Sequence, residues 1–395
     1  MTQSQPSDLY LDYAAATPVD EAVLRQMMPY FAVEFYNPSA LYGAARDVRA
    51  AVEAARGRVS DCLGARPVEI VFTAGGSEAN NLAIHGVMRR EIERAGGHGA
   101  RVPRPNILVS AIEHDSVRGT ADEYECRLMP VDEQGVIKMG RIHDLIDDNT
   151  VLVSCMYANN EIGTIQPIRE LATVVSMTRR ERLRRGVVTP LYLHVDAAQA
   201  ANYLDLQVAR LGVDLMSLNG GKIYGPKQTG ALFVRSGVEL KPLVYGGGQE
   251  SGLRSGTENV PGIVGFAAAL VAAQAARRAE ARRLQAVQRH FYERLPEFVP
   301  GAVVNGSRKH RLPNNLHITI PGTDNERLMY GLDELGIQAA AGSACSASSE
   351  TPSHVLGACG LSDEAARSSL RFTMGRATVD DDMDRLLEAL KSLLA

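Results

Sequence analysis

The chain has 395 residues, more than a single compact domain usually holds, and 45% are hydrophobic and 22% charged, as in a globular protein with a substantial core. The formal net charge of −4 gives no overall attraction to nucleic acid or to an anionic membrane surface, so we expect neither as a partner. The five cysteines are scattered and form no CxxC pair, which argues against a zinc site or a disulfide framework and favours a reducing compartment.

The N-terminal segment lacks the basic and apolar parts of a secretory signal. The most apolar long stretch, residues 263–275, is short and is followed at once by Arg277 and Arg278, so we expect no membrane span. These features predict a soluble, cytoplasmic protein.

Helical and strand-like runs alternate between about residues 45 and 240. Residues 48–63 have apolar side chains at helical spacing, and a second helix should begin at Ser77. Short apolar strands are expected over residues 69–73, 107–110, 151–156, 191–195, 214–218 and 231–235. Such strands, separated by helices, predict an α/β fold with a mostly parallel central sheet and helices on both faces.

The pattern changes after Pro261. An Ala- and Arg-rich helix should run to about Leu295, where Pro296 should end it. Isolated strands near residues 316–320 and 370–374 and a final helix from about Val379 suggest a smaller α+β domain. We therefore predict a large α/β domain of residues 13–261 and a small α+β domain of residues 1–12 and 262–395.

Phe72-Thr-Ala-Gly-Gly-Ser-Glu78 turns from a strand end through two glycines into a helix. Backbone N–H groups at such a helix start can bind a phosphate, and Gly75 and Gly76 allow its close approach. A tight turn with a Ser N-cap explains the segment equally well.

Leu193-His-Val-Asp-Ala-Ala-Gln199 places His194 and Asp196 on the same face of a strand. A carboxyl group at the end of a sheet strand lies where α/β proteins bind ligands, and it could pair with a cationic ring nitrogen. Capping of the next helix is the simpler alternative. A metal site is disfavoured because no third ligand is evident nearby.

Ser217-Leu-Asn-Gly-Gly-Lys-Ile-Tyr-Gly-Pro-Lys227 places Lys222 after a strand and among glycines, where its amine can reach a cleft. A lysine that forms a Schiff base needs a lowered pKa, which burial and nearby cations supply. Most lysines in such turns are only solvated, and Lys227 is an obvious competitor.

Gly342-Ser-Ala-Cys-Ser-Ala-Ser-Ser349 surrounds Cys345 with small side chains. Large apolar neighbours would normally bury a structural cysteine, so this thiol is interpreted as an exposed, reactive nucleophile. Cys62, Cys126 and Cys155 have apolar or helical surroundings and are expected to be inert, while Cys359 is ambiguous.

Taken together, these segments resemble cysteine desulfurases of the NifS/IscS kind, in the class V aminotransferase family of fold-type I pyridoxal-phosphate (PLP) transferases. The resemblance covers nearly the whole chain, from Leu9-Tyr-Leu-Asp-Tyr-Ala-Ala-Ala-Thr-Pro18 to the C-terminal helix. The motifs occur in the family's order: Asn37-Pro-Ser39, Phe72 to Glu78, Glu113-His114, Asn159-Asn-Glu-Ile-Gly163, His194 to Gln199, Lys222-Ile-Tyr-Gly-Pro-Lys227, Arg254-Ser-Gly-Thr257, Gly342-Ser-Ala-Cys345 and Arg371-Phe372.

The resemblance implies a role for each matching residue. Lys222 would be the Schiff-base lysine of the cofactor PLP, Asp196 the partner of the pyridinium, and His114 the residue stacked over the ring. The other implied contacts are Gln199 to the ring hydroxyl; Gly76, Ser77 and Thr257 to the phosphate; Asn160 to cofactor and substrate; and Arg371 to the substrate carboxylate. Asn219 is expected to bind the cofactor in compensation for an imidazole that the family has and this chain lacks. Thr257 would come from the second subunit of a homodimer.

The implied reaction converts L-cysteine to L-alanine. Lys222 or His114 would move the Cα proton, and Cys345 would receive the sulfur as a persulfide. The sulfur would then pass to an acceptor protein, either an iron–sulfur scaffold or a sulfur carrier for thio-cofactor or tRNA biosynthesis.

Two departures from the family pattern and one further oddity stand out. The family's Ser-Gly-His before the lysine is Asn219-Gly220-Gly221 here, and loss of one charge-assisted hydrogen bond to phosphate costs about 1.5–3 kcal/mol. The chain also stops at Ala395 without the tail that docks the scaffold in many relatives. The basic run of residues 179–185 is more typical of a solvated helix face than of a partner site.

Three alternatives remain. A selenocysteine lyase or another aminotransferase-like PLP enzyme would not need Cys345. A catalytically silent scaffold subunit is suggested by Gly221 but opposed by Lys222 and Asp196. A Rossmann dehydrogenase is disfavoured because the glycine-rich segment 246–252 lacks the preceding strand and the following acidic residue.

Overall fold

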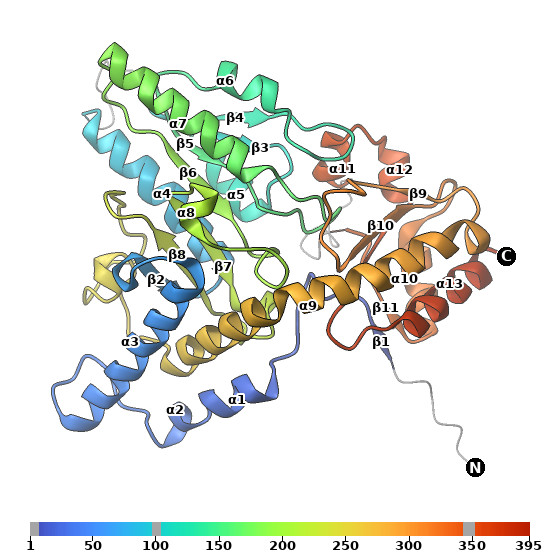
Figure 1. Ribbon diagram of the computed structural model, residues 1–395, viewed down its shortest axis with the longest axis horizontal. Helices are drawn as coiled ribbons and strands as arrows, with labels where there is room; N and C mark the ends of the chain where they lie inside the picture. The colour runs from blue at the N-terminus through green and yellow to red at the C-terminus, as the bar shows by residue number, and fades with distance from the viewer. Residues whose placement is uncertain (1–7, 97–103, 343–351) are drawn as a thin grey trace.

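Within residues 8–96, 104–342 and 352–395, which the computed structural model describes, a seven-stranded sheet forms the centre of the larger lobe (Figure 1). Its order is β2-β8-β7-β6-β5-β3-β4. The strands are β2 (Ile70–Thr73), β3 (Asn106–Ser110), β4 (Glu125–Met129), β5 (Thr150–Ser154), β6 (Tyr192–Asp196), β7 (Leu215–Asn219) and β8 (Gly230–Val234). Only β8 runs antiparallel to its neighbours in the described sheet, so the predicted mostly parallel α/β sheet is confirmed.

Helices cover both faces of this sheet because its strands are apolar on both sides. On β7, Met216 belongs to one apolar cluster and Leu215 to another. The first cluster includes α3 (Gly43–Leu63), α6 (Ile142–Leu145), α7 (Ile168–Arg185), α8 (Val208–Leu211) and the start of α9 (Val260–Phe298). The second includes α4 (Gly76–Arg94) and α5 (Asp115–Ala121).

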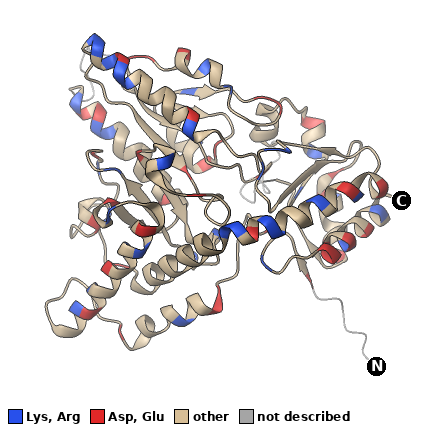
Figure 2. Ribbon diagram, viewed as in Figure 1, with Lys and Arg blue, Asp and Glu red and all other residues tan. Residues whose placement is uncertain are grey.

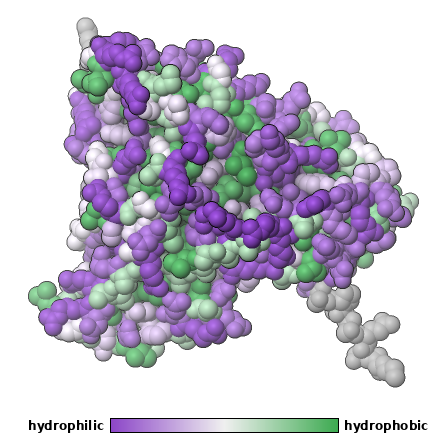
Figure 3. Space-filling model, in the orientation of Figure 1, coloured by the Kyte–Doolittle hydropathy of each residue, from purple (hydrophilic) through white to green (hydrophobic). Residues whose placement is uncertain are grey.

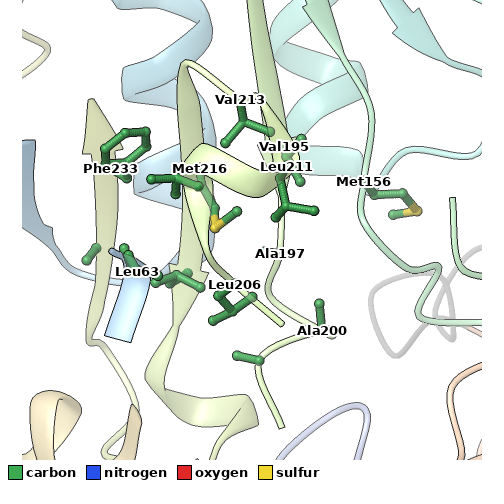
Figure 4. Packing of buried hydrophobic residues seen from close by; sticks show 14 of the residues in the cluster. Leu63, Met156, Val195, Ala197, Ala200, Leu206, Leu211, Val213, Met216 and Phe233 are labelled. Carbon is green, nitrogen blue, oxygen red and sulfur yellow. The ribbon is translucent and has the colours of Figure 1, made fainter. Parts of the chain in front are cut away.

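Figure 4 shows part of the first cluster, where Met216 and Phe233 of the sheet lie near Leu63 of α3. Val195 and Leu211 continue the same apolar layer toward β6 and α8. This packing holds the ends of β6 and β7 in place, and the candidate site lies at those ends.

The C-terminal part of the chain builds a second lobe around its own apolar cluster. Its three-stranded antiparallel sheet has the order β12-β10-β9, with β9 (Val303–Val304), β10 (Asn315–Thr319) and β12 (Ser369–Thr373). A parallel pair joins β1 (Leu9–Tyr10) to β11 (Ile337–Gln338). The helices of this lobe are α10 (Asn325–Glu334), α11 (His354–Ala358), α12 (Asp363–Arg367) and α13 (Asp380–Leu394).

The long helix α9 joins the two lobes (Figure 1). Its first half packs on α3 and on α1 (Glu21–Met27), beside α2 (Pro29–Ala32), and its second half packs on α13. The first half is nearly uncharged in Figure 2, and charged side chains begin near the middle. By length and composition α9 could cross a membrane, yet 67% of its most apolar window is buried inside the protein, as in the core helix of a globular protein.

The two ends of α9 can be compared with the sequence prediction. The helix does not end at Pro296 but continues two residues further to Phe298, although proline there lacks the N–H donor of a helical residue and its ring crowds the carbonyl of Tyr292. The predicted domain boundary at residue 261 falls in the first turn of α9, so a continuous helix, and no flexible linker, would connect the two predicted domains.

Candidate active site

A cavity of about 260 Å³ lies where strands of the large sheet end. β2, β3, β5, β6 and β7 all point their carboxyl ends toward it, which is where open α/β sheets bind ligands. Nine of the residues predicted from the sequence line this cavity: Gly76, Ser77, His114, Asn160, Asp196, Gln199, Asn219, Lys222 and Arg371.

Lys222 reaches the cavity from the short helical turn that follows β7. Its Nζ donates to the Ala15 carbonyl, and its own carbonyl accepts from Asn202 Nδ2 at 2.7 Å. The competing Lys227 donates to the Thr17 carbonyl at 2.6 Å and is not among the residues that line the cavity. The geometry therefore favours Lys222 as the reactive amine.

Asp196 ends β6 and is nearly buried at the cavity wall. One carboxyl oxygen accepts from Ala198 N at 2.9 Å and the other from Asn80 Nδ2 at 2.7 Å. Asn80 also donates to Ser116 Oγ at 2.9 Å. Sequence reasoning missed Asn80 and Ser116, although Asn80 lies three and four residues after Ser77 and Gly76, on the same face of α4.

His114 is the N-cap of α5. Its Nδ1 accepts a hydrogen bond from Ser116 N at 3.1 Å and lies 2.8 Å from Ser116 Oγ. Because Nδ1 acts as an acceptor, the neutral ring carries its proton on Nε2. The loop thus fixes both the position and the tautomer of this imidazole.

Two titratable groups beside Asp196 are buried and uncharged near neutral pH. Burial lowers the pKa of His194 to about 4, and its ring lies between Ser154 Oγ and Ser217 Oγ at 2.8 and 2.9 Å. Burial raises the pKa of Glu113 to about 8, and one of its oxygens accepts from Met156 N at 2.6 Å. His194 is therefore a structural residue of the sheet.

The corner around the start of α4 fits a phosphate. Gly75 is the N-cap, with φ of 129° and ψ of −179°, a conformation that essentially only glycine adopts. Ser77 therefore lies in the first turn and is not the cap that the sequence suggested. Asn219 Oδ1 accepts from Gly221 N at 3.0 Å, which turns the amide NH₂ of Asn219 toward Gly76, whose Cβ would lie 3.4 Å from that nitrogen.

Arg371 enters the cavity from β12 of the second lobe. Its Nη2 donates to Asp12 Oδ1 at 2.6 Å and its Nη1 to the Asn160 carbonyl at 3.1 Å. Its buried Nε has no hydrogen-bond partner. A buried guanidinium with an unused donor is suited to hold a carboxylate.

Of the described residues predicted for the site, Thr257 alone is not brought to this cavity, and it is exposed. Cys345 lies outside the described residues. Of the described cysteines, none lines the cavity. Burial raises the pKa of all four thiols, to about 11 for Cys126 and about 12 for Cys359.

The residues around the cavity fit PLP. A cavity of about 150 Å³ holds benzene, so about 260 Å³ has room for a substituted pyridine ring. The carboxyl group of Asp196 can pair with the ring nitrogen, the start of α4 can bind the phosphate, and the amine of Lys222 can bind the aldehyde. On this fold, such a donor set defines the class of PLP-dependent enzymes.

Comparison with known proteins narrows the class to a family. The model of the family "Aminotransferase class-V" matches residues 9–386, and the chain belongs to this family. "Cysteine desulfurase IscS 1" of Archaeoglobus fulgidus is 40% identical over 390 residues, covering 98% of this chain and 96% of that protein. "Cysteine desulfurase IscS" of Dictyoglomus turgidum is 36% identical over 98% of this chain and 94% of its own length.

Solved structures show the same fold. A "NIFS-LIKE PROTEIN" superposes with a TM-score of 0.87 at 30% identity and covers 98% of this chain and 99% of its own. A structure titled "SspA in complex with cysteine" has a TM-score of 0.78 at 34% identity, over 94% of this chain and all of that one. The predicted fold class and family are confirmed.

Proposed function

We propose that this chain is a PLP-dependent cysteine desulfurase that converts L-cysteine to L-alanine and transfers the sulfur to Cys345. The observation that carries the proposal is the cavity itself. An amine from one lobe, the carboxyl group of Asp196 and an arginine from the other lobe face a single space, and cysteine desulfurases are relatives over nearly the full length.

Each residue of the cavity would hold one part of the cofactor. Lys222 would bind the aldehyde, Asp196 the ring nitrogen, and His114 one face of the ring, while Gln199 would donate to the ring hydroxyl. Gly76, Ser77 and Asn219 would hold the phosphate. When bound, PLP supplies an aldehyde that captures amines and a ring that withdraws electrons from the substrate Cα.

The protein's own groups would bind L-cysteine and move its proton. Arg371, which lines the cavity, would receive the substrate carboxylate while Asp12 and Asn160 keep the guanidinium in place. Lys222 Nζ would take the Cα proton, with His114 as the second candidate base. Ser116 interacts with Nδ1 of His114. The proton on Nε2 would therefore point toward the reacting atoms.

Sulfur transfer needs no external oxidant. The C–S bond of L-cysteine breaks as an S–S bond forms to Cys345, the substrate carbon receives a proton, and the products are L-alanine and the Cys345 persulfide. A sulfur-acceptor protein, either an iron–sulfur scaffold or a sulfur carrier, would then take the outer sulfur.

Two variants test the reaction. Cys345→Ala should abolish persulfide formation and lower alanine release from L-cysteine at least about 100-fold, since the nucleophile is lost. Lys222→Ala should abolish both. A Cys345→Ala protein that releases alanine from L-cysteine at the wild-type rate would contradict the mechanism, and retention of rate on selenocysteine alone would indicate a selenocysteine lyase.

A visible absorption spectrum addresses the silent-scaffold alternative. The purified chain should be coloured, or become coloured with added PLP, and Lys222→Ala should shift the spectrum. A wild-type protein that stays colourless with PLP would support the scaffold and overturn the enzyme.

The proposal includes a homodimer. Large apolar side chains are exposed from α2 to the start of α3: Phe31 is 58%, Phe35 65% and Leu41 84% exposed. At the lower left of Figure 3, where α2 and the start of α3 lie in Figure 1, hydrophobic residues are interspersed with hydrophilic ones on the surface. Clustered exposed apolar side chains typically mark protein interfaces, and the exposed Thr257 would then serve the cavity of the partner subunit.

Light scattering with size-exclusion chromatography tests the dimer. Phe35→Asp should shift the mass from that of two chains toward that of one. The matched control is Leu183→Asp on α7, where Leu183 is 80% exposed and far from this surface in the sequence. Equal masses for wild type and Phe35→Asp, both of one chain, would refute the dimer.

A further inference from the structure

Glu161 is a buried carboxyl group that the proposed reaction does not use. It follows Asn160 in the loop after β5 and is only 2% exposed. Burial raises its pKa, against the effects of Ser353, Arg371 and His354. Burying a carboxyl group is costly unless it is hydrogen-bonded, so the partners of Glu161 indicate what holds it there.

The side chain of Glu161 lies against two separate points of the C-terminal lobe. Its Oε2 accepts from Ser353 Oγ at 2.6 Å, and a Cβ on Gly342 would lie 3.6 Å from the same oxygen. Gly342 immediately precedes residues 343–351, which contain Cys345, and Ser353 follows them by two positions. The carboxyl group of Glu161 thus binds Ser353 after the Cys345 segment, and there is room for little more than glycine between it and position 342 before that segment.

The loop of Glu161 is itself fixed to the cavity wall. Asn159 Oδ1 accepts from Glu161 N at 2.8 Å and from Ile162 N at 2.9 Å, which sets the conformation of the loop. The carbonyl of Asn160 accepts from Arg371 Nη1 at 3.1 Å. Any shift of Glu161 therefore shifts residues that line the cavity.

A second contact ties the same helix to the other side of the cavity. His354 Nε2 lies 3.0 Å from the carbonyl of Glu113, the residue before His114. Ser353 also caps α11, since its Oγ accepts from Leu356 N at 3.3 Å. The first turn of α11 is thus held by both loops that carry cavity residues.

We propose that Glu161 is a positioning residue for sulfur transfer. Through its hydrogen bond to Ser353 it holds the start of α11, which follows the Cys345 segment in the chain, against the loop of Asn160, and this anchor would govern where the thiol meets the substrate sulfur. This inference rests on the proposed desulfurase function. Misplacing a reacting group by about 1 Å can cost on the order of 100-fold in rate, which makes such anchoring consequential.

A pair of helix-capping serines provides a matched experiment. Ser353 caps α11 and donates to Glu161, whereas Ser362 caps α12 through Ala365 N at 3.2 Å, with no contact to the cavity among the described residues. Ser353→Ala and Ser362→Ala lose comparable capping, but only Ser353→Ala loses the bond to Glu161. Ser353→Thr keeps both functions and should restore the wild-type rate.

The measurement is single-turnover formation of the Cys345 persulfide after mixing PLP-loaded enzyme with L-cysteine, alongside the visible absorption change on substrate binding. Ser353→Ala should slow persulfide formation about tenfold or more while PLP content and the absorption change stay as in wild type. Ser362→Ala should stay within about twofold. In a Glu161→Ala background, Ser353→Ala should have no further effect.

Equal persulfide rates for Ser353→Ala and Ser362→Ala would overturn the role of Glu161 while leaving the desulfurase intact. Loss of the absorption change in Ser353→Ala would also overturn it, because the contact would then support cofactor or substrate binding in general. A wild-type enzyme that forms no persulfide would instead refute the proposed function and this inference together.

Discussion

Asn80 links two walls of the cavity, because its amide donates to both Asp196 and Ser116. Asp196 would pair with the cofactor ring, and Ser116 holds the Nδ1 of His114. Asn80 itself lines the cavity and is 1% exposed, and its hydrogen bonds to Asp196 and Ser116 make it a positioning residue for both.

Asn80→Ala should weaken PLP binding about tenfold, since the loss leaves Asp196 with one fewer donor in a buried setting. Equilibrium binding of PLP to the cofactor-stripped protein measures this. Asn81→Ala is the control, because Asn81 donates to the backbone carbonyls of Ser77 and Ser116 and not to Asp196. Equal affinities for the two variants would show that Asn80 has no such role.

His194 makes stability depend on pH. Its folded pKa is lowered to about 4 by burial, while an unfolded histidine has a pKa near 6.5. Between these values the unfolded chain binds the proton and the folded chain does not, so stability is full above about pH 6.5 and falls as the pH drops toward 4.

The variant His194→Asn removes this titration. The difference in unfolding free energy between wild type and His194→Asn should shrink by on the order of 3 kcal/mol from pH 7 to pH 4. Urea unfolding at matched PLP saturation measures it. A difference that stays constant or grows as the pH falls would contradict a neutral, buried His194.

Among single residues, the sequence predicted those with recognisable chemistry better than those that position them. Lys222, Asp196 and His114 belong to motifs whose chemistry is recognisable without coordinates. Asn80 and Glu161 carry no such chemistry on their own, and their importance depends on partners up to 192 residues away, such as Ser353. Only the folded structure brings those partners together.

Among the elements, α7 has a basic run that contains both buried and exposed arginines. The basic run at its C-terminal end was interpreted as a solvated face. Arg182, however, is buried and donates to the carbonyls of Thr150, Thr189 and Pro190 at 2.8, 3.2 and 3.2 Å and also to Asp147. Arg180 and Arg184 are exposed, as expected for a solvated helix face.

Arg182→Ala should therefore destabilise the protein by about 2–4 kcal/mol, because several buried carbonyl groups lose their donor at once. Arg184→Ala should change stability by no more than about 0.5 kcal/mol. Chemical denaturation of both variants provides the comparison, and similar midpoints would show that the run is solvated throughout.

The strands illustrate what periodicity can and cannot predict. Six of the seven strands of the large sheet coincide with predicted apolar runs to within two residues at each end. The missed strand, β4, is at the sheet edge and has the sequence Glu-Cys-Arg-Leu-Met with its first residue exposed. An edge strand needs little apolar surface, so its sequence resembles a loop.

At the scale of the whole molecule, the candidate active site is a cavity lined by residues of both lobes. Lys222 and Asp196 come from the large sheet, whereas Arg371 comes from the small one. The two lobes share the continuous helix α9, which restricts how far one can move relative to the other. Such an arrangement, with parts of a cavity far apart in sequence, was predicted from motif order and the family resemblance and not from periodicity.

The central claim is that an amine at Lys222 and a thiol at Cys345 serve one reaction on L-cysteine. Mass spectrometry of the PLP-loaded protein after one turnover with L-cysteine tests it most directly, with L-alanine quantified in the same sample. We predict one equivalent of alanine and an added sulfur of about 32 Da on the peptide that contains Cys345, removable by reductant. Alanine without sulfur on that peptide, or sulfur on Cys62, Cys126, Cys155 or Cys359 instead, would contradict the account.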